Sequence, residues 1–340
     1  MSESKFINFY FSNESSYSAK LNLFNDKINN KKINFCYSRK IQILNYILKN
    51  IKKKPLIYQD NDLSNILLSS LKINNKTFFF RHFKSINNTN KNLIIILLGI
   101  SRLSSNEMNQ GSSSYFIVDL LNNGHDVLIL YRDYLVDGKF YYKSFDFSDE
   151  LNMFIDLIKD TIEFNNLNLI GISGGCLTIL KFLTNLNFKE NTNLINLCFF
   201  ISCSPNIDKN ISQFNIFYNN LLKPSFKIIS NKNKDYSFCF KDNMYDIIGN
   251  IGKMNFNFNS IEEYYEHLNL SNEELNNISC PVFFINSKDD NIARYEYINE
   301  YFNLCETHKY FHFIVSETGW HTTFYNDSNN FLSTLILELI

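Results

Sequence analysis

The chain of 340 residues contains little glycine and little proline, 10 and 4 residues respectively. A G-x-S-x-G motif is therefore improbable by chance in this chain. No run reaches the roughly 20 apolar residues that a membrane-spanning helix needs, and the longest candidate, 93–100, has the length of a strand. The first residues lack the basic start and apolar run of a signal peptide. We expect a cytoplasmic protein without a transmembrane segment.

The chain has no excess of either charge, since 33 Lys and Arg face 34 Asp and Glu for a formal net charge of -1. A balanced charge gives no long-range field that would attract nucleic acid, so we expect no nucleic-acid partner. The 7 cysteines are odd in number and scattered, without a C-x-x-C pair. This pattern favours free thiols over a disulfide framework or a zinc site. We expect neither a metal nor an organic cofactor.

From Thr77 onward, short apolar runs alternate with segments of helical periodicity. Strands that are apolar throughout and alternate with helices indicate a mostly parallel sheet covered by helices on both faces. The sequence therefore predicts an α/β fold. The expected strands are 78–83, 93–98, 127–131, 167–170, 194–202, 282–286 and 310–315, and the expected helices are 115–122, 151–164, 177–186, 295–302 and 331–340.

Two regions depart from this alternation. Residues 1–75 have amphipathic spacing at 41–52 and 62–71, which predicts an N-terminal helical extension of the main domain over 76–340. The stretch of about 205–278 contains helical patches at 213–222 and 261–267 and offers no convincing strand. We interpret it as an insertion that forms a helical cap over the sheet.

The most specific motif is Gly171-Ile172-Ser173-Gly174-Gly175, which follows a predicted strand and opens a predicted helix. In a G-x-S-x-G turn, glycines remove side chains that would clash, and the serine is raised on a strained strand-to-helix corner. The helix N-terminus and the following backbone N–H can then stabilise an oxyanion. Ser173 is the candidate nucleophile. A glycine-rich turn without catalytic function is the alternative for the motif alone.

A nucleophilic serine needs a histidine base and an acid, which in this arrangement follow it in chain order. Asp289 and Asp290 come directly after the strand predicted at 282–286, and either could be the acid. We prefer Asp290, since the acid in such loops stands two positions before an apolar residue, here Ile292, and Asp289 would be a solvated neighbour. Of the 6 histidines, only His321 follows the last strand in a glycine-containing loop.

The oxyanion hole should take backbone N–H groups from two loops. Gly174 follows the nucleophile, and Gly99-Ile100 follows the strand predicted at 93–98. We assign the two donors to the backbones of Gly174 and Ile100. Taken alone, Gly99 could equally be a turn at the end of a strand.

With these residues in place, the sequence from about residue 77 to 340 resembles the α/β-hydrolase superfamily, and within it the YheT-like branch of abhydrolase domain-containing esterases and lipases. Four segments carry the likeness to the branch: the serine-tyrosine segment at 111–117, the cap segment at 258–265, the strand and acid loop at 281–290, and Thr318-Gly-Trp-His321-Thr-Thr-Phe324.

The resemblance implies an α/β-hydrolase fold and a serine hydrolase that cleaves a lipid or medium-chain carboxylic ester through an acyl-enzyme. A peptidase or an acyltransferase would use the same triad. Leu98 and Trp320 differ from the residues usual in the branch, and they motivate a further alternative, a non-catalytic hydrolase-fold protein that binds a ligand or partner. Neither the substrate nor the oligomeric state follows from the sequence.

Overall fold

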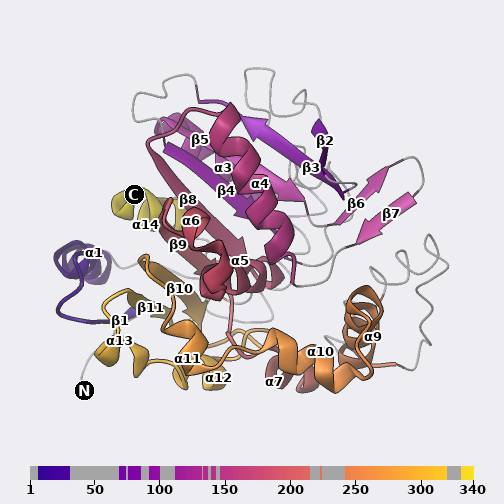
Figure 1. The fold of residues 1–340 in the computed structure, drawn as a ribbon. Coiled ribbons are helices and arrows are strands. Elements are labelled where there is room, and N and C mark those ends of the chain that lie inside the picture. The colour runs from indigo at the N-terminus through magenta and orange to yellow at the C-terminus, as the bar shows by residue number, and fades with distance from the viewer. Residues whose placement is uncertain are drawn as a thin grey trace.

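The fold is built around one large sheet whose strands are apolar because helices cover both of its faces (Figure 1). The computed structural model describes residues 7–30, 69–73, 76–85, 92–99, 112–131, 133–136, 139–142, 146–214, 223, 242–319 and 331–340. Among these residues, no helix is long and apolar enough to cross a bilayer.

The strands are β1 (Ile7–Phe11), β2 (Ser69–Ile73), β3 (Lys76–Phe83), β4 (Asn92–Leu97), β5 (His125–Tyr131), β6 (Asp133–Val136), β7 (Lys139–Tyr142), β8 (Asn166–Ile172), β9 (Ile195–Ile201), β10 (Val282–Ser287) and β11 (Phe311–Ser316). The helices are α1 (Ser18–Asn30), α3 (Ser112–Asn122), α4 (Ser148–Thr161), α5 (Gly174–Thr184), α6 (Lys189–Thr192), α7 (Ile207–Ser212), α9 (Met244–Phe256), α10 (Ile261–Leu268), α11 (Asn272–Leu275), α12 (Tyr295–Asn299), α13 (Leu304–Thr307) and α14 (Phe331–Leu339), with a 3₁₀ turn, η2, at Leu186–Phe188.

Nine strands form the main sheet in the order β1-β11-β10-β9-β8-β4-β5-β3-β2, and β6 pairs with β7 in a separate hairpin. The strands from β5 to β11 within this order run parallel, whereas β1, β2 and β3 are antiparallel to their neighbours. Each strand expected from the sequence is present, and the expected mostly parallel sheet is confirmed. The neighbours β8 and β4 lie in the centre, so the carboxyl end of β8 opens at the middle of the sheet.

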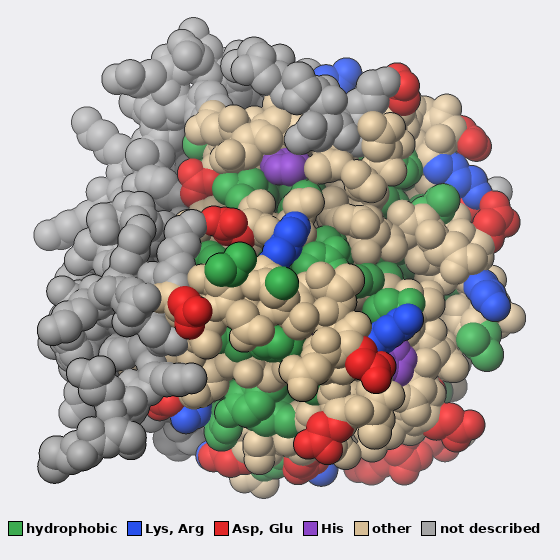
Figure 2. Space-filling view, turned by 90° about the vertical axis from the view of Figure 1, so that its left-hand side faces the viewer, with side chains coloured by type: hydrophobic (Ala, Val, Ile, Leu, Met, Phe, Trp, Pro, Cys, Tyr) green, Lys and Arg blue, Asp and Glu red, His purple; other side chains and the backbone are tan. Residues whose placement is uncertain are grey.

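Two apolar layers sandwich this sheet, one on each face. On one face, α4 and α5 pack against alternate strand residues, in a cluster that includes Phe154, Leu180 and Phe284. On the other face, α1, α3 and α14 cover the sheet, in a cluster that includes Leu120 and Leu335. The alternation of side chains along each strand divides the residues between the two layers. Figure 2 views the side on which α1 lies, where the visible described side chains of both charges are dispersed among hydrophobic ones.

The cap region has its own small apolar core. Helices α7, α9 and α10 gather on one side of the molecule, in the lower part of Figure 1. Their buried residues pack together with Leu177, which lies in the first turn of α5. A Cβ on Gly252 would lie 2.0 Å from the ring of Tyr264, so glycine is what allows α9 and α10 to approach this closely. The described residues between 205 and 278 contain no strand, the helix expected at 261–267 is present, and most of the helix expected at 213–222 lies outside the described residues.

The described part of residues 1–75 contains the helix α1 and the strands β1 and β2. β1 pairs with β11 at one edge of the main sheet, and β2 pairs with β3 at the other. The helix expected at 62–71 is wrong for Ser69–Leu71, which belong to β2, and the helix expected at 41–52 lies outside the described residues. Antiparallel pairing of β2 with the next strand, β3, overrode the local periodicity, which carries no information about strand partners.

A buried histidine joins the N-terminal segment to the sheet. His312 in β11 donates from Nδ1 to the Val282 carbonyl oxygen at 3.1 Å, so its Nε2 is left to accept from the Ser15 hydroxyl at 2.5 Å. Its ring stacks on Phe283 with centroids 4.4 Å apart. Burial lowers the pKa of His312 to about 4, because a charged imidazole loses its hydration there.

The depressed pKa of His312 predicts a loss of stability in mild acid. Below its ordinary pKa near 6.5 the unfolded chain binds the proton and the folded chain does not, so the free energy of unfolding falls as pH drops from about 6.5 to about 4. The contribution of this residue is on the order of 3 kcal/mol. We expect His312→Gln, which does not titrate in this window, to flatten the pH dependence measured by denaturant unfolding. The partly exposed His308→Gln is the control and should flatten it less; an unaltered slope in His312→Gln would contradict the prediction.

Candidate active site

Ser173 occupies a sharp corner between the end of β8 and the start of α5. Its backbone angles are φ 54° and ψ -123°, a conformation that residues other than glycine rarely adopt. Among the described non-glycine residues, only Ser202 and Asn257 also have positive φ. The Ser173 N–H donates to the Ile201 carbonyl oxygen at 2.8 Å, and the Ser173 carbonyl oxygen accepts from Cys176 N–H at 3.0 Å. These two bonds hold the strained corner at the end of β9 and at the first turn of α5.

Three glycines make room for this corner, each at a different contact. A Cβ on Gly171 would lie 2.6 Å from Cα of Cys176, and one on Gly175 would lie 2.3 Å from the Leu97 carbonyl oxygen. A Cβ on Gly99 would lie 2.8 Å from Cβ of Ser173 and 3.2 Å from its hydroxyl oxygen. The motif glycines Gly171 and Gly175 therefore leave the space that the sequence analysis predicted, at points where a side chain would clash. The loop after β4 begins in direct contact with Ser173.

Backbone hydrogen bonds link the carboxyl ends of neighbouring strands one after another. Ser202 N–H, just after β9, donates to the Ile285 carbonyl oxygen of β10 at 2.9 Å, and Lys288 N–H, just after β10, donates to the Ser316 carbonyl oxygen of β11 at 2.9 Å. Together with the bond from Ser173 to β9, they link the ends of β8, β9, β10 and β11. The loops that carry the candidate nucleophile, acid and base thus start from adjacent points on one sheet edge.

Asp290 lies in a tight turn after β10 and is 3% exposed. Its Oδ1 accepts from Ile292 N–H at 2.7 Å and from Ala293 N–H at 3.0 Å. Two backbone donors on one carboxylate oxygen fix the orientation of the group. Buried and held in this way, Asp290 can orient and stabilise a partner cation.

Asp289 has a role that the sequence did not indicate. Its Oδ1 accepts from Gly319 N–H at 3.0 Å, so this partly exposed residue also takes part in a contact between loops. Gly319 lies two residues before His321. The loop after β11 is therefore attached to the acid loop next to the predicted base. His321 and Ile100 themselves lie outside the described residues.

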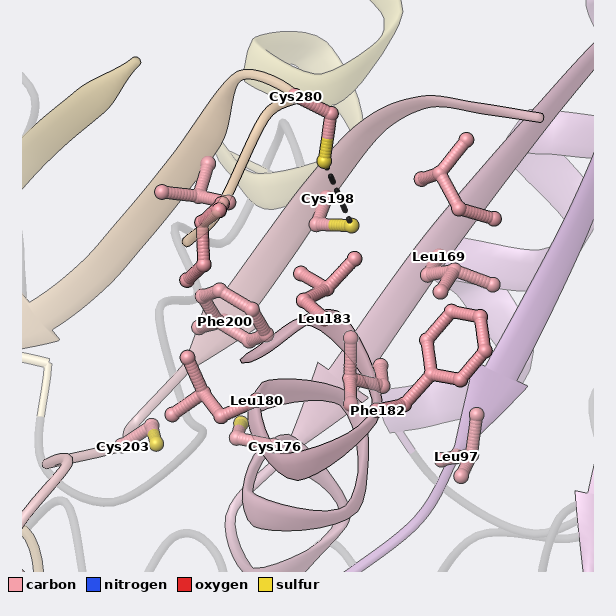
Figure 3. Close-up of a cluster of buried hydrophobic side chains, with 14 of the residues drawn as sticks. Leu97, Leu169, Cys176, Leu180, Phe182, Leu183, Cys198, Phe200, Cys203 and Cys280 are labelled. Carbon is pink, nitrogen blue, oxygen red and sulfur yellow. Dashed lines mark hydrogen bonds between the residues drawn. The ribbon is translucent and has the colours of Figure 1, made fainter. Parts of the chain in front are cut away.

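Cys176, in the first turn of α5, carries a thiol whose surroundings keep it neutral. Figure 3 shows its side chain on α5 with those of Leu180, also on α5, and Phe200 of β9, inside the apolar cluster. Burial, and then the neighbouring thiol of Cys203, raise the pKa of Cys176 well above its ordinary value. A thiol held protonated is a poor nucleophile, so Cys176 does not compete with Ser173 as the candidate nucleophile at this corner.

The other cysteines and acidic groups form no metal site in the part of the chain that the structure describes. The Sγ atoms of Cys198 and Cys280 lie 4.0 Å apart, as neighbouring thiols (Figure 3). The five described cysteines are free, in line with the sequence pattern, and Cys36 and Cys239 lie outside the described residues.

The strain at Ser173 predicts an unusual order of stabilities for its variants. Glycine adopts positive φ without steric cost, so Ser173→Gly should be more stable than Ser173→Ala by about 1–2 kcal/mol, measured by denaturant unfolding. The control is Ser212, an exposed residue of α7 with ordinary φ, where alanine should be the more stable replacement because glycine is the poorer helix former. If alanine were the more stable replacement at Ser173 as well as at Ser212, the corner at Ser173 would not be strained.

No protein-family model matches the sequence, and no curated protein matches it at significant similarity. Solved structures do match. The 2,6-dihydroxy-pseudo-oxynicotine hydrolase is 14% identical with a TM-score of 0.50 over 75% of this chain, and the match spans 62% of that hydrolase. An esterase of Pyrococcus furiosus is 16% identical with a TM-score of 0.50, and the match covers 81% of this chain and 92% of the esterase. From this likeness and the order of its strands, the chain has the α/β-hydrolase fold.

Proposed function

We propose that the protein is a serine hydrolase that cleaves a carboxylic ester through a covalent acyl-enzyme. The observation that carries the proposal is the conformation of Ser173, held at φ 54° between the central strand β8 and the N-terminus of α5. Strain of this kind persists only where surrounding contacts impose it, and it clusters at functional sites. A serine raised on such a corner presents its hydroxyl where a helix N-terminus favours negative charge.

The proposed triad is Ser173, His321 and Asp290. The His321 imidazole takes the hydroxyl proton as the Ser173 oxygen attacks the ester carbonyl carbon, and Asp290 holds the imidazole tautomer and stabilises its charge. Two features support this assignment: Asp290 is fixed by backbone donors, and Asp289 attaches the loop that leads to His321.

The tetrahedral oxyanion would be bound by the backbone N–H groups of Gly174 and Ile100. Gly174 opens α5 directly after the nucleophile, and Gly99 contacts Ser173 one residue before Ile100. Collapse of the intermediate expels the alcohol, which takes the proton from His321. Water, activated by the same base, then attacks the acyl-enzyme and releases the acid.

We further propose an apolar acyl group, of a lipid or medium-chain ester, for the substrate. The cap core of α7, α9 and α10 is made of aliphatic and tyrosine side chains and packs on Leu177, one turn from the nucleophile. We propose that the acyl group binds between this cap core and the nucleophile, where removal from water would stabilise a hydrocarbon chain. The proposed YheT-like affiliation rests on the sequence segments at 111–117, 258–265, 281–290 and 318–324.

The proposal predicts that Ser173→Ala abolishes covalent labelling by a fluorophosphonate and lowers p-nitrophenyl ester turnover at least about a thousandfold. Mass spectrometry of the labelled wild-type chain should place the adduct on the peptide that contains Ser173. Exposed Ser212→Ala serves as the control and should label like the wild type. Full ester turnover in Ser173→Ala would remove this residue from the reaction, and a wild-type chain that neither labels nor turns over would favour a non-catalytic binding protein.

Replacing each of the two adjacent carboxylates in turn by an amide tells their roles apart. Asp290→Asn should lower kcat by about a thousandfold or more, because an amide presents the wrong partner to the imidazole. Asp289→Asn keeps an oxygen that can accept from Gly319 N–H, so its kcat should fall less than about tenfold. Steady-state kinetics on one p-nitrophenyl ester measures both. The reverse order of the two effects would assign the acid to Asp289.

A further inference from the structure

The turn that holds Asp290 is completed by a residue from the cap. Three consecutive backbone N–H groups follow the acid, and those of Ile292 and Ala293 donate to Asp290 itself. The third, of Arg294, donates to Oδ1 of Asn210 at 2.8 Å. Asn210 lies in α7, more than 80 residues earlier in the chain. One of the hydrogen bonds that shape the acid turn therefore depends on how α7 is placed.

The side chain of Asn210 is held firmly enough to act as a support. It is 5% exposed, and its Nδ2 donates to the Asn206 carbonyl oxygen at 2.7 Å, which fixes the amide orientation so that Oδ1 faces Arg294. A buried amide whose donor and acceptor are both satisfied has little freedom to rotate. Loss of the side chain would leave the Arg294 N–H without its acceptor.

Helix α7 is in turn fixed to the rest of the cap. Ile207 and Ile211 pack in the cap core, and Ile207 N–H donates to Oδ1 of Asn269, the residue that ends α10, at 3.1 Å. A second link from α7 is exposed: Lys209 Nζ lies 2.9 Å from Glu300 Oε2. A continuous path of contacts thus runs from α10 through α7 and Asn210 to the backbone that follows Asp290.

We propose that Asn210 is a positioning residue for Asp290, through which the placement of the cap is transmitted to the triad. The inference rests on the proposed hydrolase function. Asn210 touches neither the substrate nor the reacting atoms; it holds Arg294 N–H, and thereby the turn whose other two N–H groups orient the carboxylate. If the cap moved away from the sheet, the hydrogen bond from Arg294 N–H to Asn210 Oδ1 would break. Asp290 therefore reaches its catalytic geometry only when α7 lies against the acid turn.

The test compares Asn210→Ala with Asn210→Asp and Lys209→Met in the full chain, using a fluorophosphonate as probe. Asn210→Asp keeps an oxygen acceptor for Arg294 N–H, and Lys209→Met removes the exposed link of α7 to Glu300 while leaving Asn210 in place. We expect the maximal labelling rate of Asn210→Ala to fall about fivefold to tenfold, the effect of one lost hydrogen bond, with the half-saturating probe concentration unchanged. Asn210→Asp should recover most of the rate, and Lys209→Met should match the wild type.

The final extent of labelling separates positioning from unfolding. A positioning role predicts that Asn210→Ala still reaches one label per chain, only more slowly, and that hydrogen exchange rises in peptides covering 290–296. Labelling at the wild-type rate, or a final extent below one label per chain without rescue by Asn210→Asp, would overturn the proposal. If the wild-type chain itself takes no label at Ser173, the hydrolase function has failed and this inference with it, a result visible before any variant is compared.

Discussion

The close approach of the end of β4, the corner after β8 and the first turn of α5 is the contact on which the site depends. Gly99, Gly171 and Gly175 each face atoms closer than a Cβ could tolerate. In a chain with 10 glycines, three of them meet around one serine. Backbone packing without intervening side chains is what forces Ser173 into positive φ, and the helix and strands on both sides supply the stability that offsets this local cost.

Around this corner, the parallel arrangement turns distance along the chain into proximity in space. One backbone hydrogen bond links the carboxyl end of each of these strands, β8, β9, β10 and β11, to the next. The segments near residues 173, 202, 288 and 316 therefore lie side by side at the carboxyl ends of the strands. The acid turn and the loop after β11 are then attached to one another through Asp289. The carboxyl ends of the strands therefore determine the main geometry of the site, and polar side chains such as Asp289 fix the loops that follow the strands.

Much of this could be predicted from the sequence, because buried parallel strands are apolar along their whole length and a G-x-S-x-G corner requires its glycines. The strands β8 and β10 and the positions of Ser173 and Asp290 at their ends follow from such patterns. The role of Asp289 could not be foreseen, since its partner Gly319 is 30 residues away and donates through its backbone. Likewise, β1 and β2 are short edge strands whose partners, not their own composition, determine their structure.

The pairing of β1 with β11 also bears on how the chain is made. Ile7 lies opposite Ser316, and Phe24 of α1 packs with Phe331 of α14, so segments far apart in the sequence must both be synthesised before they can pack. Until then β11 is unavailable, and β1 remains an unpaired apolar strand in the nascent chain. Contacts with so large a sequence separation make closure of the sheet a late step of folding, and they make chaperone protection of the N-terminal segment during synthesis advantageous.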